Sequence, residues 1–280
     1  MVKILDLDKL FDKYIESYVY ANVGRVNPEE IENNIPVLYK EFGDEKIKEL
    51  DGKTPNEYYK SFTTKELLTA LETHLDNDVS VSDFLCEAII SKKEQSKDLE
   101  DAISEDKSEQ FTLYIMNFIS EMGVSFSTQR FLEFVLYDYS EPIKELATEM
   151  LTQKADIVKE NILLEFENVG EKTKGYLVEI LSYVKLKDDK IFDVLVKEFA
   201  RHEKEIPFYV NLLARYGDER AVPFIERVIE REDVSYADFE ELRFALEVFG
   251  VIYDKERDFS KDKFYNKIKG KRQNANTNKN

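Results

Sequence analysis

The stretch EIPFYVNLLARYGDERAVPFIERVIER at residues 205–231 decides the fold of this chain. It contains two amphipathic helix patterns, and the residues between them are Tyr216-Gly217-Asp218-Glu219-Arg220. Gly217 can end the first helix, because glycine takes the left-handed conformation without a Cβ clash. The Asp218 carboxylate can accept N–H groups at the start of the second helix. The stretch therefore predicts a helix hairpin with a very short turn and with Leu213 on its buried side.

Similar pairs of helix patterns recur in the C-terminal part of the chain. Ile180-Leu181 aligns with Leu212-Leu213 and with Ala245-Leu246, at offsets of 32 and 33 residues. The partner helices repeat at an offset of 30, with Phe192, Leu195 and Phe199 corresponding to Val222, Ile225 and Ile229. A period in the low thirties is typical of helix-pair repeats, and one pair alone cannot bury its apolar face. We therefore expect the pairs to stack as an α-solenoid.

Helix signals continue through the N-terminal part. Capping patterns begin at Asn27, Thr54 and Thr63, and apolar residues recur at helical spacing. One such stripe runs through Ile31, Ile35, Leu38 and Phe42, with Pro36 as an irregularity. The chain has only nine Gly and six Pro, which disfavours a turn-rich all-β fold. These features predict an all-α protein.

The residues around the short turn resemble those of a known family. Leu212-Leu213-Ala214, Tyr216-Gly217-Asp218-Glu219 and Ala221-Val222-Pro223 are similar to the short HEAT-like repeats of phycobilin lyases. The resemblance is strongest at 204–231, weaker at 173–200 and 237–250, and absent from 1–110. It implies a HEAT-like superhelix of antiparallel helix pairs. The lyase activity is not carried over, because no catalytic motif matches.

Composition divides the chain into four parts. Residues 1–90 are expected to be a divergent helical region, either degenerate repeats or a cap. The polar segment 91–108 is expected to be a link or a surface helix, and 109–253 to hold the HEAT-like repeats. Residues 254–280 are expected to form a basic, disordered tail, with seven basic residues and one acidic residue after position 260. The end of this tail, from Gly270, has no apolar residue except Ala275.

The overall charge limits the kinds of partner. Forty basic and 58 acidic residues give a net charge of −18, and Trp is absent. Nucleic acid is therefore an unfavourable partner, since binding it requires a basic surface. A basic or neutral protein is the expected partner, although the acidity can also serve solubility alone. No signal peptide or membrane-spanning pattern is present, and Cys86 is the single cysteine, so we expect a cytoplasmic protein without a membrane partner.

Few residues suit catalysis or metal binding. His202 lies in a charged inter-helix turn, where a surface role is expected, and Cys86 lies in an apolar helix pattern, where a buried core position is expected. His74 with Cys86 is the one nucleophilic pair that the composition allows. The segment Asp76–Glu87 spaces oxygen ligands as in a calcium loop, but Val81 replaces the glycine of the sharp turn, so a helix-capping role for Ser80 or Ser82 is preferred. No catalytic residue, metal ligand or cofactor is predicted.

The predicted function is a non-catalytic protein-interaction scaffold or adaptor. Its candidate interaction surface consists of Tyr209, Arg220, Glu226, Arg227 and Glu230, although helical i, i+4 ion pairs explain the charged members equally well. The alternative is a small-molecule or lyase-type enzyme that uses a groove between repeats, and nucleic-acid binding ranks third. The partner's identity and the oligomeric state are left open.

Overall fold

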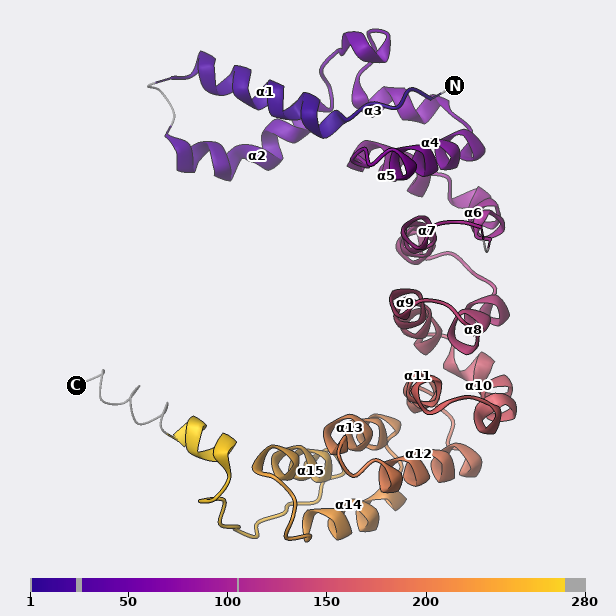
Figure 1. Ribbon diagram of the computed structural model, residues 1–280, viewed down its shortest axis with the longest axis vertical. Coiled ribbons are helices and arrows are strands. Elements are labelled where there is room, and N and C mark those ends of the chain that lie inside the picture. The colour runs from indigo at the N-terminus through magenta and orange to yellow at the C-terminus, as the bar shows by residue number, and fades with distance from the viewer. Residues whose placement is uncertain (1, 24–26, 105, 270–280) are drawn as a thin grey trace, which may run out of the picture. The chain divides into compact units, whose positions relative to one another are not determined.

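The computed structural model describes residues 2–23, 27–104 and 106–269, and all its regular elements in these ranges are helical (Figure 1). The all-α prediction is confirmed. Among the described helices, none combines the length and apolarity needed to cross a membrane. The chain divides into two compact units, residues 1–127 and 128–280, and each is described by itself below.

Unit 1 holds seven α-helices and three short 3-10 turns within its described residues. The α-helices are α1 (Leu7–Ala21), α2 (Pro28–Phe42), α3 (Pro55–Tyr58), α4 (Thr64–Asp76), α5 (Asp83–Ile90), α6 (Ser96–Ala102) and α7 (Glu109–Met122). The 3-10 turns are η1 (Lys48–Leu50), η2 (Tyr59–Ser61) and η3 (Lys93–Gln95). Capping boxes begin α2, α3 and α4 at the three positions expected from the sequence.

The core of unit 1 is built by α4, α5, α6 and α7, which pack against one another. Leu71, Ile89, Leu99 and Ile115 are completely buried there, one from each helix. The predicted link 91–108 contains α6, which contributes Leu99 to this core, and α7 packs against it. The first compact unit ends at Ser127.

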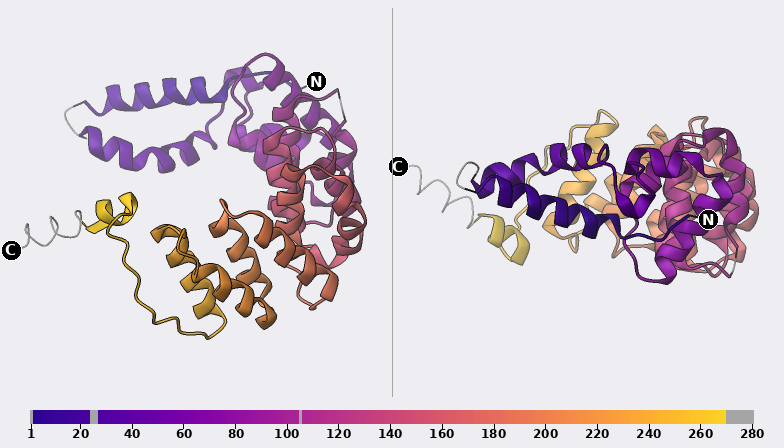
Figure 2. Two further views of the ribbon diagram at one scale, coloured as in Figure 1. Left: turned by 60° about the horizontal axis from the view of Figure 1, so that its bottom comes forward. Right: turned by 90° about the horizontal axis from the view of Figure 1, so that it is seen from above.

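The α1–α2 hairpin of unit 1 is far less buried than the core. The two helices run side by side in opposite directions (Figure 2). Leu38 and Phe42 at the end of α2 are buried, whereas Ile35, one turn earlier on the same stripe, is 41% exposed. Pro36 lies inside α2, as the sequence indicates.

Unit 2 is a double row of helices (Figure 1). One row consists of α9 (Glu141–Thr152), α11 (Glu171–Ser182), α13 (Ile206–Tyr216) and α15 (Tyr236–Val248), each in contact with the next. The other row holds α10 (Ala155–Glu165), α12 (Asp189–Arg201) and α14 (Val222–Ile229), and α8 (Thr128–Leu136) packs on α9. Two 3-10 turns, η4 (Phe166–Asn168) and η5 (Glu219–Ala221), lie between these helices, and residues 263–269 are also helical.

The turn at Gly217 and Asp218 has the geometry that the sequence predicts. Gly217 ends α13 with φ +70°, and its N–H donates to the Leu213 carbonyl. The Asp218 carboxylate accepts from the main-chain N–H of Arg220 at 3.1 Å, so it caps η5, which leads into α14. Both predictions are confirmed.

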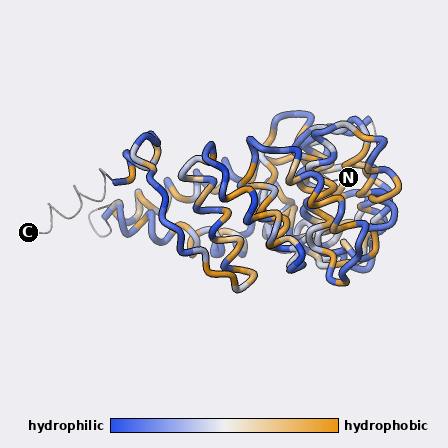
Figure 3. The backbone as a smooth tube through the Cα atoms, turned by 90° about the horizontal axis from the view of Figure 1, so that it is seen from below, coloured by the Kyte–Doolittle hydropathy of each residue, from blue (hydrophilic) through white to orange (hydrophobic). Residues whose placement is uncertain are grey.

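The aligned apolar pairs form the seam between the two rows. Five of the six residues are at most 1% exposed and Leu212 is 2% exposed; the set is Ile180, Leu181, Leu212, Leu213, Ala245 and Leu246. Hydrophobic and hydrophilic positions alternate along the helical turns in Figure 3, as expected for helices that are buried on one side. Burial of Leu213 is therefore confirmed.

The described part of the basic tail differs from a disordered chain. Phe259 is 8% exposed and packs edge-on to Tyr236 and at 5.1 Å from the Phe239 ring. The Arg257 guanidinium donates to the carbonyls of Ile229 and Arg231 at the end of α14. These contacts, which composition alone does not reveal, hold residues 254–259 on unit 2. The predicted disorder from Gly270 onwards lies outside the described residues.

Candidate functional site

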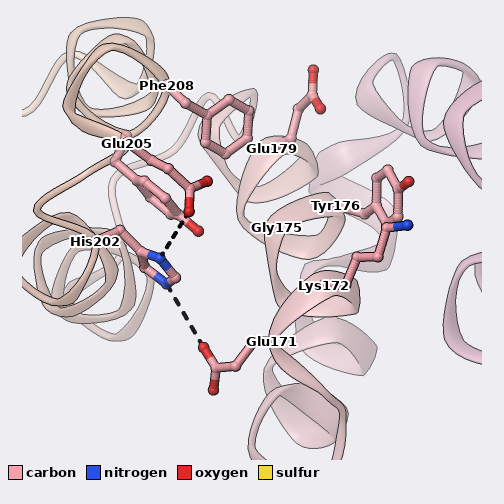
Figure 4. A pocket seen from close by; sticks show the side chains of 9 residues that line it. Glu171, Lys172, Gly175, Tyr176, Glu179, His202, Glu205 and Phe208 are labelled. Atoms are coloured by element: carbon pink, nitrogen blue, oxygen red, sulfur yellow. Dashed lines mark ion pairs between the residues drawn. The ribbon is translucent and has the colours of Figure 1, made fainter.

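The candidate site lies in unit 2, where the end of α12 meets the first turn of α11 and the start of α13. Residues 203–205 connect α12 to α13, so His202, Glu205 and Tyr209 are brought close to Glu171 of α11. Their side chains line a hollow of about 380 Å³ (Figure 4). Local sequence explains the placement: His202 is the C-cap residue that follows α12, and Pro207 stands in the first turn of α13, where a proline needs no N–H partner.

An imidazole surrounded by carboxylates forms the polar side of the hollow. His202 Nε2 lies 3.3 Å from Glu198 Oε2 and 3.7 Å from Glu171 Oε2. His202 Nδ1 lies 3.7 Å from Glu205 Oε1. Glu198 is completely buried, and the His202 side chain is 19% exposed. The prediction of a plain surface role for His202 was therefore incomplete, because α11 brings the Glu171 carboxylate, which is distant in the sequence, beside the nearby Glu198 and Glu205.

Two cations contact the same carboxylates from the other side. Arg201 donates from Nη1 to Glu198 Oε1 at 2.9 Å and from Nη2 to Glu171 Oε1 at 3.1 Å. Lys174, which is buried, lies 3.3 Å from the same Glu171 oxygen. Hydrogen bonding from Lys174, with a further contribution from Arg201, lowers the pKa of Glu171. Glu171 is thus held in its charged form.

Tyr209 fixes the orientation of the imidazole. The two rings are stacked, with centroids 4.3 Å apart and planes 13° from parallel. Burial, and then the nearby carboxylates of Glu205 and Glu198, raise the pKa of Tyr209 to about 12. The phenol is therefore neutral at physiological pH and acts as a packing surface rather than as a proton acceptor.

Aromatic side chains form the other side of the hollow. Phe208 is 39% exposed and projects toward Glu179, and Tyr176 projects from α11 together with Lys172 (Figure 4). The Tyr176 hydroxyl donates to Glu141 of α9, and Lys172 Nζ lies 2.9 Å from the same carboxylate. The hollow therefore combines the exposed Phe208 ring and the half-buried Tyr176 ring with acidic groups.

The residues predicted to form an interaction surface lie in three different settings. Tyr209 is on α13 and 4% exposed, whereas Glu226 and Arg227 are exposed on α14 in the other row. Arg220 bonds to Asp218 and Asp189 and covers the Phe192 ring at 4.3 Å. Glu230, at the end of α14, accepts from the Tyr253 hydroxyl at 2.9 Å and from Lys255. Only Tyr209 lines the hollow, and Arg220 and Glu230 hold segments of the unit together.

The candidate nucleophilic pair has a structural role in unit 1. His74 is buried, with Nδ1 2.7 Å from the Ala70 carbonyl and Nε2 3.3 Å from that of Leu5. Burial, and then the Asp83 carboxylate, raise the pKa of the Cys86 thiol to about 12. A thiol with this pKa is not a nucleophile at neutral pH.

The calcium-like segment Asp76–Glu87 spans the end of α4, the loop 77–82 and the first residues of α5. Ser82 occupies the N-cap position of α5 without a capping bond from its side chain, and the Ser80 hydroxyl donates to Asp8. Asn77 Nδ2 donates to the Thr73 carbonyl at 2.7 Å. The capping interpretation is thus confirmed for the position of Ser82 but not for a side-chain bond.

Sequence reasoning missed Glu171 and Glu198 as site residues. One signal was available: Glu198 and His202 are four residues apart, which places them on one face of a helix. The contribution of Glu171 required knowing how α11 packs on α12. Comparisons of the chain with protein-family models, with curated proteins and with solved structures found no match.

Proposed function

We propose that unit 2 is a short HEAT-like solenoid that binds a basic protein segment on the exposed side of α11, α13 and α15. The observation that carries the proposal is a row of aromatic side chains, one on each of these three successive helices. They are Tyr176, Phe208 and Phe244. The proposed role is non-catalytic.

The double row of helices supports the solenoid part of this proposal. Each of α9, α11 and α13 contacts the next helix of its own row, and the second row covers one side only. A stack of this kind leaves the other side of the first row as an extended surface. The resemblance of residues 204–231 to HEAT-like repeats agrees with it.

The apolar content of this surface suits a peptide with apolar anchors. A second hollow, of about 570 Å³, lies between α13 and α15 and shares Phe208 and Glu179 with the first. Phe244 and Val248 line it and are 58% and 53% exposed. Adjoining hollows with exposed aromatic rings match the way in which protein segments insert hydrophobic anchors into grooves.

The charge of the surface favours a basic segment. Glu179 and Glu205 line the first hollow together with Glu171, which Arg201 and Lys174 already contact, and Lys172 is paired with Glu141 of α9. Lys or Arg residues that flank the apolar anchors would meet these carboxylates. Such charge complementarity speeds association and discriminates against acidic segments.

A peptide-display selection against the full chain tests the proposal. We expect enriched peptides to combine Lys or Arg with aromatic or aliphatic residues. The variants Phe208→Ala and Phe244→Ala should each weaken binding of a selected peptide by about tenfold, the usual loss for an interface anchor. Higher salt should weaken binding further.

The matched control is Leu164→Ala, which truncates another exposed apolar residue, 75% exposed on α10 in the other row. It should leave the affinity unchanged. Equal losses from all three variants, or selected peptides without basic residues, would contradict the proposed surface. The absence of any enriched sequence would contradict the interaction role itself.

A further inference from the structure

We propose that His202, Glu198 and Glu171 form a binding site for a divalent transition-metal ion. This inference concerns the same hollow but does not depend on the proposed peptide partner. It places the ion among three atoms, namely His202 Nε2, Glu198 Oε2 and Glu171 Oε2.

The spacing of these atoms is that of metal ligands. The ligand atoms of the three residues all lie within 4.8 Å of one another, and Nε2 is 3.3 Å and 3.7 Å from the two carboxylate oxygens. Zinc bonds to N and O measure about 2.0–2.2 Å, which puts tetrahedral ligands roughly 3.3–3.6 Å apart. An ion can therefore be accommodated with small movements of the side chains.

The carboxylates present one oxygen each to the proposed ion. Arg201 binds the Oε1 atoms of both Glu198 and Glu171, and Lys174 contacts Oε1 of Glu171. The Oε2 atoms are the ones that face His202. Hydrogen-bonded carboxylates are usual among metal ligands, since outer groups hold them in place. The two cations also reduce the negative charge of the site, so we expect micromolar rather than nanomolar affinity.

The imidazole directs its two nitrogens toward carboxylates. His202 Nε2 lies within hydrogen-bond distance of Glu198 Oε2, and Nδ1 lies 3.7 Å from Glu205 Oε1, so an ion would take the place of a proton between Nε2 and Glu198 while Nδ1 keeps its proton toward Glu205. Arrangements in which a carboxylate contacts the outer nitrogen of a metal-binding histidine are common. The stacked Tyr209 ring fixes the plane of the imidazole. Binding would displace any proton on Nε2 to solvent.

The ligand set selects the class of ion. One imidazole nitrogen with two carboxylate oxygens suits Zn²⁺, Co²⁺ or Mn²⁺, whereas Ca²⁺ and Mg²⁺ prefer oxygen ligands alone. The imidazole stands at the hollow of about 380 Å³, so a water molecule can supply a further ligand. The geometry describes binding only, and no reaction is assigned to the ion.

Titration of the chelator-treated full chain with Zn²⁺, followed by calorimetry, tests the site. We expect one equivalent to bind, and Co²⁺ to give a visible absorption band of a low-coordinate ion. The variants His202→Gln and Glu171→Gln should each weaken Zn²⁺ binding at least tenfold. Glu171 is 54% exposed at its side chain, so its variant is expected to remain folded.

The control variant is Glu179→Gln, which removes another carboxylate of the same hollow that is not in the cluster. It should bind Zn²⁺ as the parent does. If the parent does not bind Zn²⁺, or if His202→Gln binds it equally well, these residues form an ion-pair network only. Either result would overturn the proposed metal site. Peptide binding by the parent is measured separately, so either proposal can fail without the other.

Discussion

The α2 helix of unit 1 and the α13 helix of unit 2 have similar amphipathic patterns but different surroundings. On α2, Ile35 is 41% exposed although Leu38 and Phe42 on the same stripe are buried. On α13, Leu212 and Leu213 are almost completely buried because α11, α12 and α15 all pack against this helix. An apolar stripe thus predicts a helix reliably, and its burial depends on how many neighbours the fold supplies.

The largest expected effect is a loss of stability when aspartate replaces a buried leucine of α13, compared with the same replacement on α2. Leu213→Asp should destabilise unit 2 by at least about 3 kcal/mol, because it buries an unpaired charge in the seam between the rows. Ile35→Asp should cost at most about 1 kcal/mol, since a carboxylate there remains hydrated. Denaturant unfolding monitored by circular dichroism measures both. Comparable losses would mean that α2 is as tightly packed as α13.

The elements were largely predictable from the sequence because their signals are local. The turn at Gly217-Asp218 and the capping boxes depend on residues within a few positions of one another. The unit boundary after Ser127 was not predictable in this way. It depends on α7 packing with α4, α5 and α6, and no local pattern encodes that packing.

The residues of the candidate site were likewise predictable only where the signal is local in the sequence. Tyr209 was identified from its residue type, whereas Glu171 joins His202 across 31 positions of sequence through the packing of α11 on α12. Burial of the Glu198 carboxylate is likewise a tertiary effect, compensated by Arg201. A polar residue in an amphipathic helix is read from the sequence as solvent-exposed, so buried ionic groups escape this kind of prediction.

The second prediction compares two aspartates that cap helices. Asp218 caps η5, and its carboxylate also binds the side chain of Arg220, which bonds to Asp189 of α12. Asp6 caps α1 through the Lys9 N–H, with a pairing to the lysine side chain. Asp218→Ala should cost about 1–2 kcal/mol, and Asp6→Ala about 0.5 kcal/mol because α1 is less constrained. Thermal unfolding of the two variants measures the difference, and a larger loss for Asp6→Ala would reverse the comparison.

The cost of Asp218→Ala should also depend on pH. Hydrogen bonding from Arg220 lowers the pKa of Asp218 from its ordinary value of 3.8. A lowered folded-state pKa means that the carboxylate stabilises the fold above that ordinary value and loses this effect as the pH falls through the folded-state pKa. The stabilities of the parent and the variant should therefore converge in acid. A difference that stays constant below pH 3.8 would rule out the ionised pair as its source.

A smaller effect is expected at the glycine that ends α13. Gly217 has φ +70°, and a Cβ there would meet its nearest atoms at 3.8 Å, an ordinary contact distance. The cost of Gly217→Ala should therefore come from the left-handed backbone alone and be about 1 kcal/mol. Chemical denaturation measures it. A cost of several kcal/mol would indicate that the turn is restrained by packing as well.

The smallest expected effect has the opposite sign and occurs at a second glycine of unit 2. Gly175 lies within α11, and a Cβ built on it meets no atom within 4 Å. Gly175→Ala should stabilise the protein by about 0.5–1 kcal/mol, because alanine loses less conformational freedom in a helix. The same measurement should show this gain beside the loss from Gly217→Ala. If Gly175→Ala also lowers the stability, the added methyl group in the hollow disturbs the neighbouring side chains of α11.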